Sequence, residues 1–171
     1  MTNRPLPEVW LRGPVPDIPP LLQPVAHSLL QCREELAAAV AGLGAEEIWA
    51  RPAGAASVGF HLRHVAGSVD RLFTYARGEQ LSPTQHAALV AEPHPDLAPN
   101  AGPRLLAAFE ETVERALDQL RSTREDMLLE ARRVGRAGLP STVLGLLFHA
   151  AEHAQRHAGQ VVTTAKLVGG R

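Results

Sequence analysis

Three histidines near the end of the chain follow one another at intervals of four residues: His149, His153 and His157. On an α-helix, residues four apart lie along one side, so these imidazoles would form a slowly drifting row. Imidazole is the commonest protein ligand for transition metals, and a pair at i and i+4 can hold one ion from a single helix. Two more histidines, His61 and His64, lie close together far upstream. Five of the eight histidines therefore fall in two short segments, which indicates a metal site.

A helical wheel separates the three C-terminal histidines from one another. The apolar side of their helix is expected to contain Leu147, Ala150, Ala151, Ala154, Ala158, Val161 and Ala165. His153 and His157 lie on one flank of that side with Gln160 beside them, whereas His149 lies farther toward the rim. The pair 153/157 is therefore placed at the edge of the core, with His149 and Gln160 as possible supporting or substrate-contacting residues.

The upstream helix carries a similar polar flank. Its expected apolar side contains Leu62, Val65, Ala66, Val69, Leu72, Phe73 and Ala76. The flank beside it contains His61, His64, Ser68, Arg71 and Tyr75. By the wheel, His61 lies closer to the core than His64. Arg71 is expected to pair with a carboxylate or, less favourably, to anchor an anionic substrate. If the two flanks face each other, one ion can bridge the helices.

The donor set favours an open metal site. Three neutral nitrogen ligands with one vacant position are typical of catalytic sites, whereas closed four-ligand sites are structural. Such an ion can lower the pKa of a bound water or hold a thiol in its ionised form near neutral pH. The Glu-x-x-His pattern of di-iron carboxylate bundles is absent, and Cys32 is the only cysteine. These observations disfavour a di-iron site and exclude cysteine-based zinc frameworks and an intrachain disulfide.

Four long helices are expected to position these residues. Apolar periodicity and capping residues place them at about 21–43, 57–77, 103–124 and 141–168, with a short helix possible at 84–91. Ser57 and Ser141 are the expected N-caps, strand signals are weak, and 130–138 is predicted to be a basic loop. We predict an all-α four-helix bundle formed by one domain over residues 21–171. Residues 1–20, with six prolines, are predicted to form an extended arm.

Composition restricts the classes of partner. The formal net charge of −1 gives no general attraction to nucleic acid or to anionic membranes. The one basic run, at 132–136, has no aromatic residues beside it for stacking on bases. No apolar stretch reaches membrane-spanning length, and the N-terminus has no secretory signal pattern. We therefore expect a cytoplasmic protein that binds neither nucleic acid nor membranes.

The two histidine segments together resemble the DinB/YfiT-like superfamily of metalloenzymes. The similarity rests on residues 57–75 and on the run from His153 to Gln160 and covers roughly residues 21–168. The resemblance implies a four-helix bundle whose metal is held by one histidine of the second helix and an H-x-x-x-H pair of the last. Applied to this sequence, the resemblance implies that the ligands are His64, His153 and His157, with His61 as the alternative to His64. This chain has Ala158 where the family commonly has arginine, which leaves no counterpart for that side chain.

The resemblance also implies a choice of activities. Related proteins act in thiol chemistry or are described as metal-dependent hydrolases. The leading hypothesis is that a divalent ion, zinc or nickel, activates a low-molecular-weight thiol for transfer of its sulfur to an electrophile. The alternatives are a hydrolase that uses water ionised on the metal and a non-enzymatic bundle that binds a ligand or partner. A homodimer formed through the first or third helix is also expected.

Overall fold

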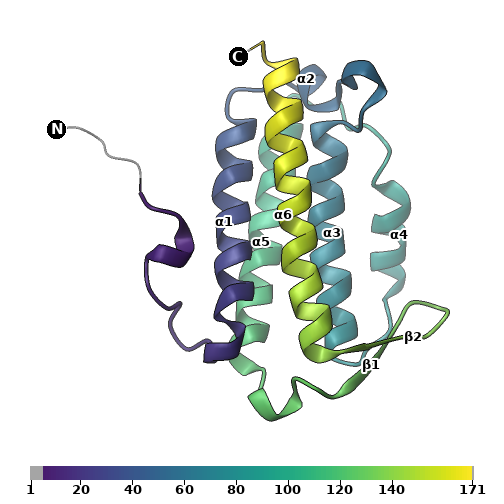
Figure 1. The fold of residues 1–171 in the computed structure, drawn as a ribbon. Helices are drawn as coiled ribbons and strands as arrows, with labels where there is room; N and C mark the ends of the chain where they lie inside the picture. The colour runs from purple at the N-terminus through teal and green to yellow at the C-terminus, as the bar shows by residue number, and fades with distance from the viewer. Residues whose placement is uncertain (1–5, 171) are drawn as a thin grey trace.

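The computed structural model describes residues 6–170, in which four long helices pack side by side as a bundle (Figure 1). These helices are α1 (Gln23–Val40), α3 (Val58–Ala76), α5 (Ala101–Ser122) and α6 (Val143–Val168). The shorter helices are α2 (Ala45–Trp49) and α4 (Pro83–Ala91). The predicted all-α four-helix bundle is confirmed. The division into an arm and one domain at residue 20 stays a prediction, and residues 1–5 of that arm lie outside the described residues.

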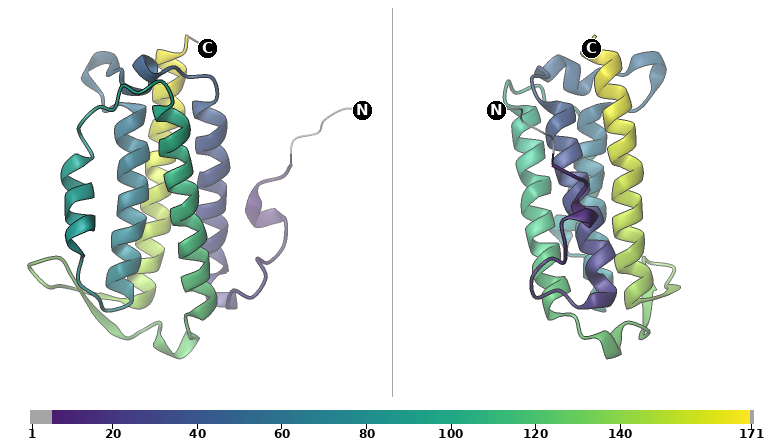
Figure 2. Two further views of the ribbon diagram at one scale, coloured as in Figure 1. Left: turned by 180° about the vertical axis from the view of Figure 1, so that it is seen from behind. Right: turned by 60° about the vertical axis from the view of Figure 1, so that its left-hand side comes forward.

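The path of α4 determines the topology of the bundle. Helix α4 runs along the outside of α3 and returns the chain to the end at which α3 begins (Figure 2). Helix α5 therefore runs parallel to α3, and α6 runs antiparallel to it. The most extensive helix pairings are α3 with α6, α1 with α6, and α3 with α5. The two histidine-bearing helices are thus direct neighbours.

Local sequence accounts for most helix boundaries. The hydroxyl of Ser57 accepts a hydrogen bond from the backbone N–H of Phe60 and caps α3, as predicted. Helix α6 is capped by Thr142, whose hydroxyl accepts from the N–H of Gly145, so the prediction of Ser141 is one residue early. Helix α5 begins at Ala101, two residues before the expected position.

A β-hairpin replaces the basic loop predicted at 130–138. Strands β1 (Ala131–Val134) and β2 (Leu139–Thr142) pair antiparallel. Gly135 and Gly138 lie in the turn with φ of 66° and 61°, values that glycine adopts without a Cβ clash. The guanidinium of Arg132 donates to the carbonyl oxygen of Ala76 and ties the hairpin to the end of α3. The expectation of a loop was wrong because two short polar strands carry little apolar alternation.

The core follows the predicted apolar sides closely. Every residue expected on the apolar side of α6 is buried, and on α3 only Ala66 and Leu72 are partly exposed. Small alanines on α6 allow close approach of α1, as the Cys32 thiol shows by lying 3.5 Å from the carbonyl oxygen of Ala154. Burial raises the pKa of that thiol, so Cys32 is a core residue and not a reactive one.

The N-terminal segment lies along α1. Val9 and Ile18 are buried, and the backbone N–H of Val9 donates to the side chain of Gln31 at 2.9 Å. The side-chain amide of Gln23 bonds to the carbonyl oxygens of Val15 and Ile18. Side chains of α1 thus provide hydrogen-bond partners for a proline-rich segment that, from residue 6 onward, has no regular structure of its own beyond short 3₁₀ turns.

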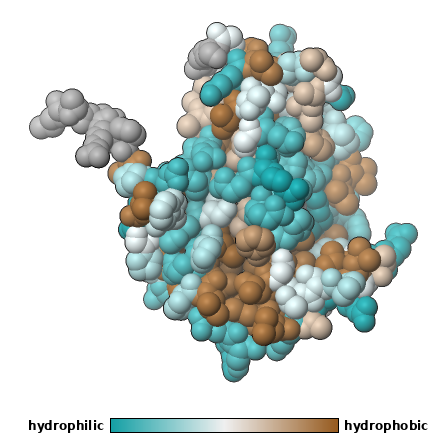
Figure 3. Space-filling view, in the orientation of Figure 1, coloured by the Kyte–Doolittle hydropathy of each residue, from teal (hydrophilic) through white to brown (hydrophobic). Residues whose placement is uncertain are grey.

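One face of the molecule combines hydrophilic and apolar surface. Figure 3 shows an apolar area over the beginnings of α1 and α6 within a largely hydrophilic face. Leu21 and Phe148 are among the large apolar side chains that are more than half exposed. Within residues 6–170, no helix has both the length and the apolar character required to cross a membrane. The predicted homodimer stays a prediction.

Candidate metal centre

Helices α3 and α6 bring three of the predicted histidines together. His64 comes from α3, and His153 and His157 come from successive turns of α6. One ligand atom from each lies within 4.8 Å of the other two. The Nε2 atoms of His64 and His153 are 3.0 Å apart. The i, i+4 pair and the single histidine from the facing helix therefore converge on one point between the two helices.

The three imidazoles fit a divalent ion. Two nitrogens bound to one zinc ion in a tetrahedron lie about 3.3 Å apart, given zinc–nitrogen distances of about 2.0–2.1 Å. The nitrogen pair of His64 and His153 is already close to that separation, and a nitrogen of His157 lies within 4.8 Å of both. Imidazole suits zinc, nickel, copper and iron alike. The donor set thus admits several metals and leaves further coordination positions for a substrate or water.

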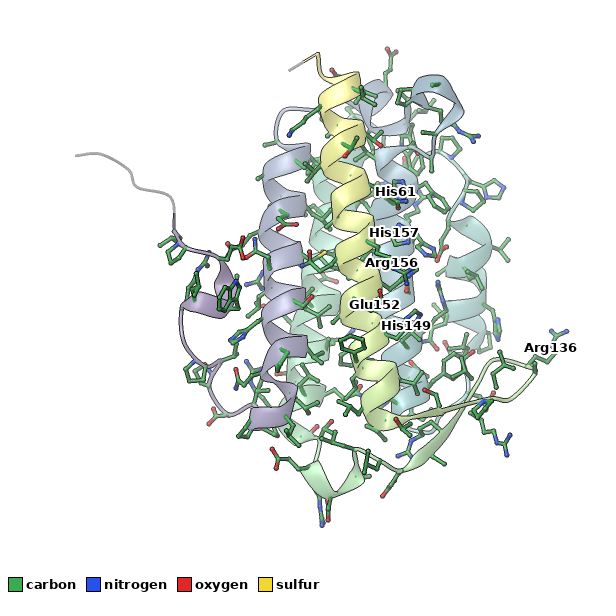
Figure 4. All side chains as sticks on the ribbon, in the orientation of Figure 1. His61, Arg136, His149, Glu152, Arg156 and His157 are labelled. Atoms are coloured by element: carbon green, nitrogen blue, oxygen red, sulfur yellow. The ribbon has the colours of Figure 1, made fainter. Side chains whose placement is uncertain are left out.

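The partner of His157 is His61, one turn away on α3 from His64. The Nδ1 atoms of His61 and His157 are 2.9 Å apart, and the two side chains lie at neighbouring heights of the bundle in Figure 4. This contact uses Nδ1 of His157 and leaves its Nε2 available to a metal. A hydrogen bond between two imidazoles requires one N–H and one bare nitrogen. With Nε2 of His157 on a metal, Nδ1–H of His157 would donate to His61.

Burial keeps these imidazoles uncharged. Burial, reinforced by neighbouring His64, His153 and His61, lowers the pKa of His157 to about 4. Burial also lowers the pKa of His61 and of His153, with His64 contributing to both. Neutral imidazoles at pH 7 offer the lone pairs that a metal ion requires. The two ligands from α6, His153 and His157, can therefore receive a cation without prior loss of a proton.

Glu92, at the end of α4, is the partner of His64 and was not predicted. Its Oε2 lies 2.8 Å from Nδ1 of His64, and its Oε1 accepts a hydrogen bond of 2.8 Å from Arg71. Burial alone would raise the pKa of Glu92, but the hydrogen bonds from His64 and Arg71 hold it below its usual value. A buried carboxylate next to a metal-binding histidine is a common supporting partner in metal sites. The residue precedes an irregular segment, and no spacing motif in the sequence points to it.

The structure gives defined positions to the other predicted residues of α3, namely Arg71, Tyr75 and His61. Arg71 forms an ion pair with Glu92, so of the two expectations for it the structure shows the carboxylate partner. Tyr75 is buried in the core. His61 is 5% exposed, deeper than His64, as the wheel placed it. Its nitrogen contacts His157 and it is not among the three grouped histidines. Its role as the alternative ligand stays a prediction.

His149 and Gln160 lie at the exposed edge of the site. Nδ1 of His149 is 2.6 Å from Oε1 of Glu152, and the same oxygen accepts a hydrogen bond of 2.8 Å from Arg156. Figure 4 shows these three side chains along α6, on the same helix as His157. Gln160 is exposed one turn beyond His157. The supporting roles of His149 and Gln160 stay predictions.

Comparisons with known proteins agree with this arrangement. The family model described as the DinB superfamily matches residues 28–161, a span that includes both histidine segments. A conserved protein from Enterococcus faecalis, known from its crystal structure, superimposes with a TM-score of 0.68 at 22% sequence identity. The match covers 88% of this chain and 98% of that chain. At this identity the likeness shows the shared fold alone. No curated protein sequence matches the chain.

Proposed function

Because the chain belongs to the DinB superfamily, we propose that it is a metal-dependent enzyme in which His64, His153 and His157 hold one divalent ion, zinc or nickel. The observation that carries this proposal is the convergence of three imidazole nitrogens within 4.8 Å from two helices. When bound, the ion would supply Lewis acidity that lowers the pKa of a thiol or water in its open position.

The carboxylates beside the histidines favour a thiol over water as the activated group. Glu92 is engaged by His64 and Arg71, and Glu152 by His149 and Arg156. Hydrolysis gains from a free general base that takes a proton from water, and neither carboxylate is free. A thiol has a much lower intrinsic pKa than water, so the same metal ion ionises a thiol more completely near neutral pH. We therefore propose that a low-molecular-weight thiol loses its proton to solvent and its sulfur, still bound to its own carbon, forms a bond to an electrophilic carbon, from which the leaving group departs with the bonding electrons.

A small cavity next to the site supports a small substrate. Phe60 stacks on His64, with ring centroids 5.5 Å apart and an angle of 12° between the planes. The same ring lines a cavity of about 220 Å³ together with Arg51 and Pro93. Pockets for drug-sized ligands measure about 300–1,000 Å³, so this one suits smaller molecules. A larger cavity, of about 560 Å³, lies beside Trp10 and His27. None of the three histidines lines either cavity, and the small one adjoins the site only through Phe60.

The test is a rate measurement with metal-loaded protein, candidate thiols, and a halogenated or epoxide electrophile. The proposal predicts a thiol-dependent rate well above that of His64→Ala, with His86→Ala as a control. His86 is an exposed histidine on α4, outside the group of three. A rate that needs no thiol and rises with pH would support hydrolysis instead. Equal rates for wild type and His64→Ala in both assays would contradict an enzymatic role and favour a non-enzymatic binding bundle.

A further inference from the structure

We propose that Glu92 is a positioning residue for the metal centre: held by Arg71 in the space beside Gly67, its carboxylate fixes which nitrogen of His64 faces His153 and His157. This inference rests on the proposed function for the presence of the ion. It goes beyond that function because it makes a segment outside the two ligand helices a determinant of metal affinity.

The first support is the hydrogen-bond chemistry of the carboxylate. Glu92 is 5% exposed, and an ionised carboxylate can only accept hydrogen bonds. The 2.8 Å contact with His64 therefore requires a hydrogen on Nδ1 of that ring. A neutral imidazole with Nδ1–H carries its lone pair on Nε2, the atom that lies 3.0 Å from His153. The carboxylate thus selects the form of His64 that can bind a metal at the observed place.

The second support is the space that Gly67 leaves on α3. A Cβ atom at this position would lie 2.6 Å from Nη1 of Arg71 and 2.9 Å from Oε1 of Glu92. Both distances are shorter than real Cβ contacts, so the guanidinium of Arg71 and the carboxylate of Glu92 would have to shift to admit a side chain at residue 67. Glycine in a helix interior is less favourable than alanine by about 1 kcal/mol. Because residue 67 is a glycine, the buried ion pair of Arg71 and Glu92 has room to pack against the surface of α3.

The third support is that the fold places Glu92 independently of His64. Arg63 of α3 donates hydrogen bonds to the carbonyl oxygens of Ala91 and His94, on either side of the glutamate. The same guanidinium lies 5.0 Å from the ring centroid of Trp49, whose indole N–H donates to the carbonyl oxygen of Asp96 at 2.7 Å. The backbone that carries the carboxylate is therefore attached to α2 and α3 by contacts that do not involve His64, His153 or His157.

Glu92→Gln and Glu92→Ala test the proposal, with Glu152→Gln as the matched control. A glutamine has one amide oxygen and one NH₂ group, so it cannot place an acceptor oxygen at both positions that the carboxylate presents, one toward Arg71 and one toward His64. Glu152 also contacts a histidine and an arginine, but on the exposed side of α6. Metal affinity is measured by competition with a chelator, using zinc and nickel. We expect both Glu92 variants to bind about 10- to 100-fold more weakly, and the control to bind like wild type.

A second readout needs no metal. Nitrogen-15 NMR of the histidine rings in the metal-free protein reports which nitrogen carries the hydrogen. We expect Nδ1–H for His64 in wild type and a loss of that preference in either Glu92 variant that remains folded by circular dichroism. Folded Glu92 variants with wild-type metal affinity and an unchanged His64 ring would overturn the proposal. A wild-type protein that binds no metal would contradict the proposed function, and the NMR spectrum would still decide whether Glu92 fixes His64.

Discussion

Two groups of the same three residue types lie at and beside the candidate metal centre, and they differ in burial. The inner trio consists of His64, Glu92 and Arg71, and the outer trio consists of His149, Glu152 and Arg156. In each, a glutamate lies within 2.8 Å of a histidine Nδ1 and of an arginine nitrogen. The inner side chains are 7–22% exposed, whereas the outer ones are 33–62% exposed.

The difference teaches that contact geometry alone does not determine what such a group contributes. The outer trio lies within two turns of α6, where water competes for every charge and an exposed pair contributes about 0–1 kcal/mol. The inner trio joins α3 to the end of α4, and its charges have little access to water. Removal of one partner of a buried pair costs more than the pair itself contributes, because the remaining charge stays buried.

Replacement of the arginine should give the largest difference between the two trios in the free energy of unfolding. Arg71→Met leaves the carboxylate of Glu92 buried without its cation, so we expect the free energy of unfolding to fall by about 3 kcal/mol. Arg156→Met removes a cation from an exposed pair and should cost less than about 1 kcal/mol. Urea denaturation of both variants measures these changes. If both variants lose the same free energy of unfolding, burial does not explain the difference expected between the two trios.

Acidification should lower the stability of the metal-free protein through His157, a neighbour of His64 in the inner trio. The pKa of His157 is about 4 in the folded protein, below the ordinary value of about 6.5 in the unfolded chain. As the pH falls from 6.5 to 4, the unfolded state therefore takes up the proton first, and stability is lost over that window. Allowing for partial exposure, we expect a loss of about 1–2 kcal/mol for the metal-free protein.

The variant His157→Gln provides the check on this pH effect. Denaturation of the metal-free protein at several pH values should show a shallower loss of stability in the variant between pH 6.5 and 4. Further acidification should destabilise wild type again, because the pKa of Glu92 is lowered and its contribution disappears as the carboxylate is protonated. A wild-type stability that stays constant from pH 6.5 to 4 would contradict the assigned burial of His157.

Two glycine substitutions give the smallest expected effects, and these have opposite signs. Gly67→Ala should destabilise the protein by about 1 kcal/mol, because the strain on Arg71 and Glu92 exceeds the gain in helix propensity. Gly159, on an exposed part of α6, has no atom within 4 Å of a Cβ built there. Gly159→Ala should therefore stabilise by about 0.5–1 kcal/mol. Thermal unfolding decides the signs, and stabilisation by both substitutions would show that the ion pair tolerates a side chain at residue 67.

Much of the fold was predictable because helices depend on local patterns. Apolar spacing located the four long helices, and the alanine-rich side of α6 is buried as the wheel indicated. The spacing of His153 and His157 placed them on one flank for the same reason. The hairpin was missed because its turn depends on the backbone freedom of two glycines and not on apolar alternation.

The supporting contacts of the site could not be predicted from local patterns. Glu92 contacts His64 across 28 residues of sequence, and that contact exists only because α4 runs back along α3. Likewise, the wheel placed His61 near the core but could not show that its nitrogen would contact His157. The selection of His64 as the expected ligand came from the family resemblance, not from the wheel. Contacts between distant elements follow from topology, which a single sequence reveals only through likeness to known folds.

Metal analysis of the purified protein tests the central claim most directly. The protein is prepared without a histidine tag or added metal, and the histidine of each trio is replaced in turn, as is His157, a further proposed ligand. We predict about one equivalent of a divalent metal in wild type and in His149→Ala, and little or none in His64→Ala or His157→Ala. A metal-free wild type, or a His64→Ala protein that is folded and retains its full equivalent, would contradict the account.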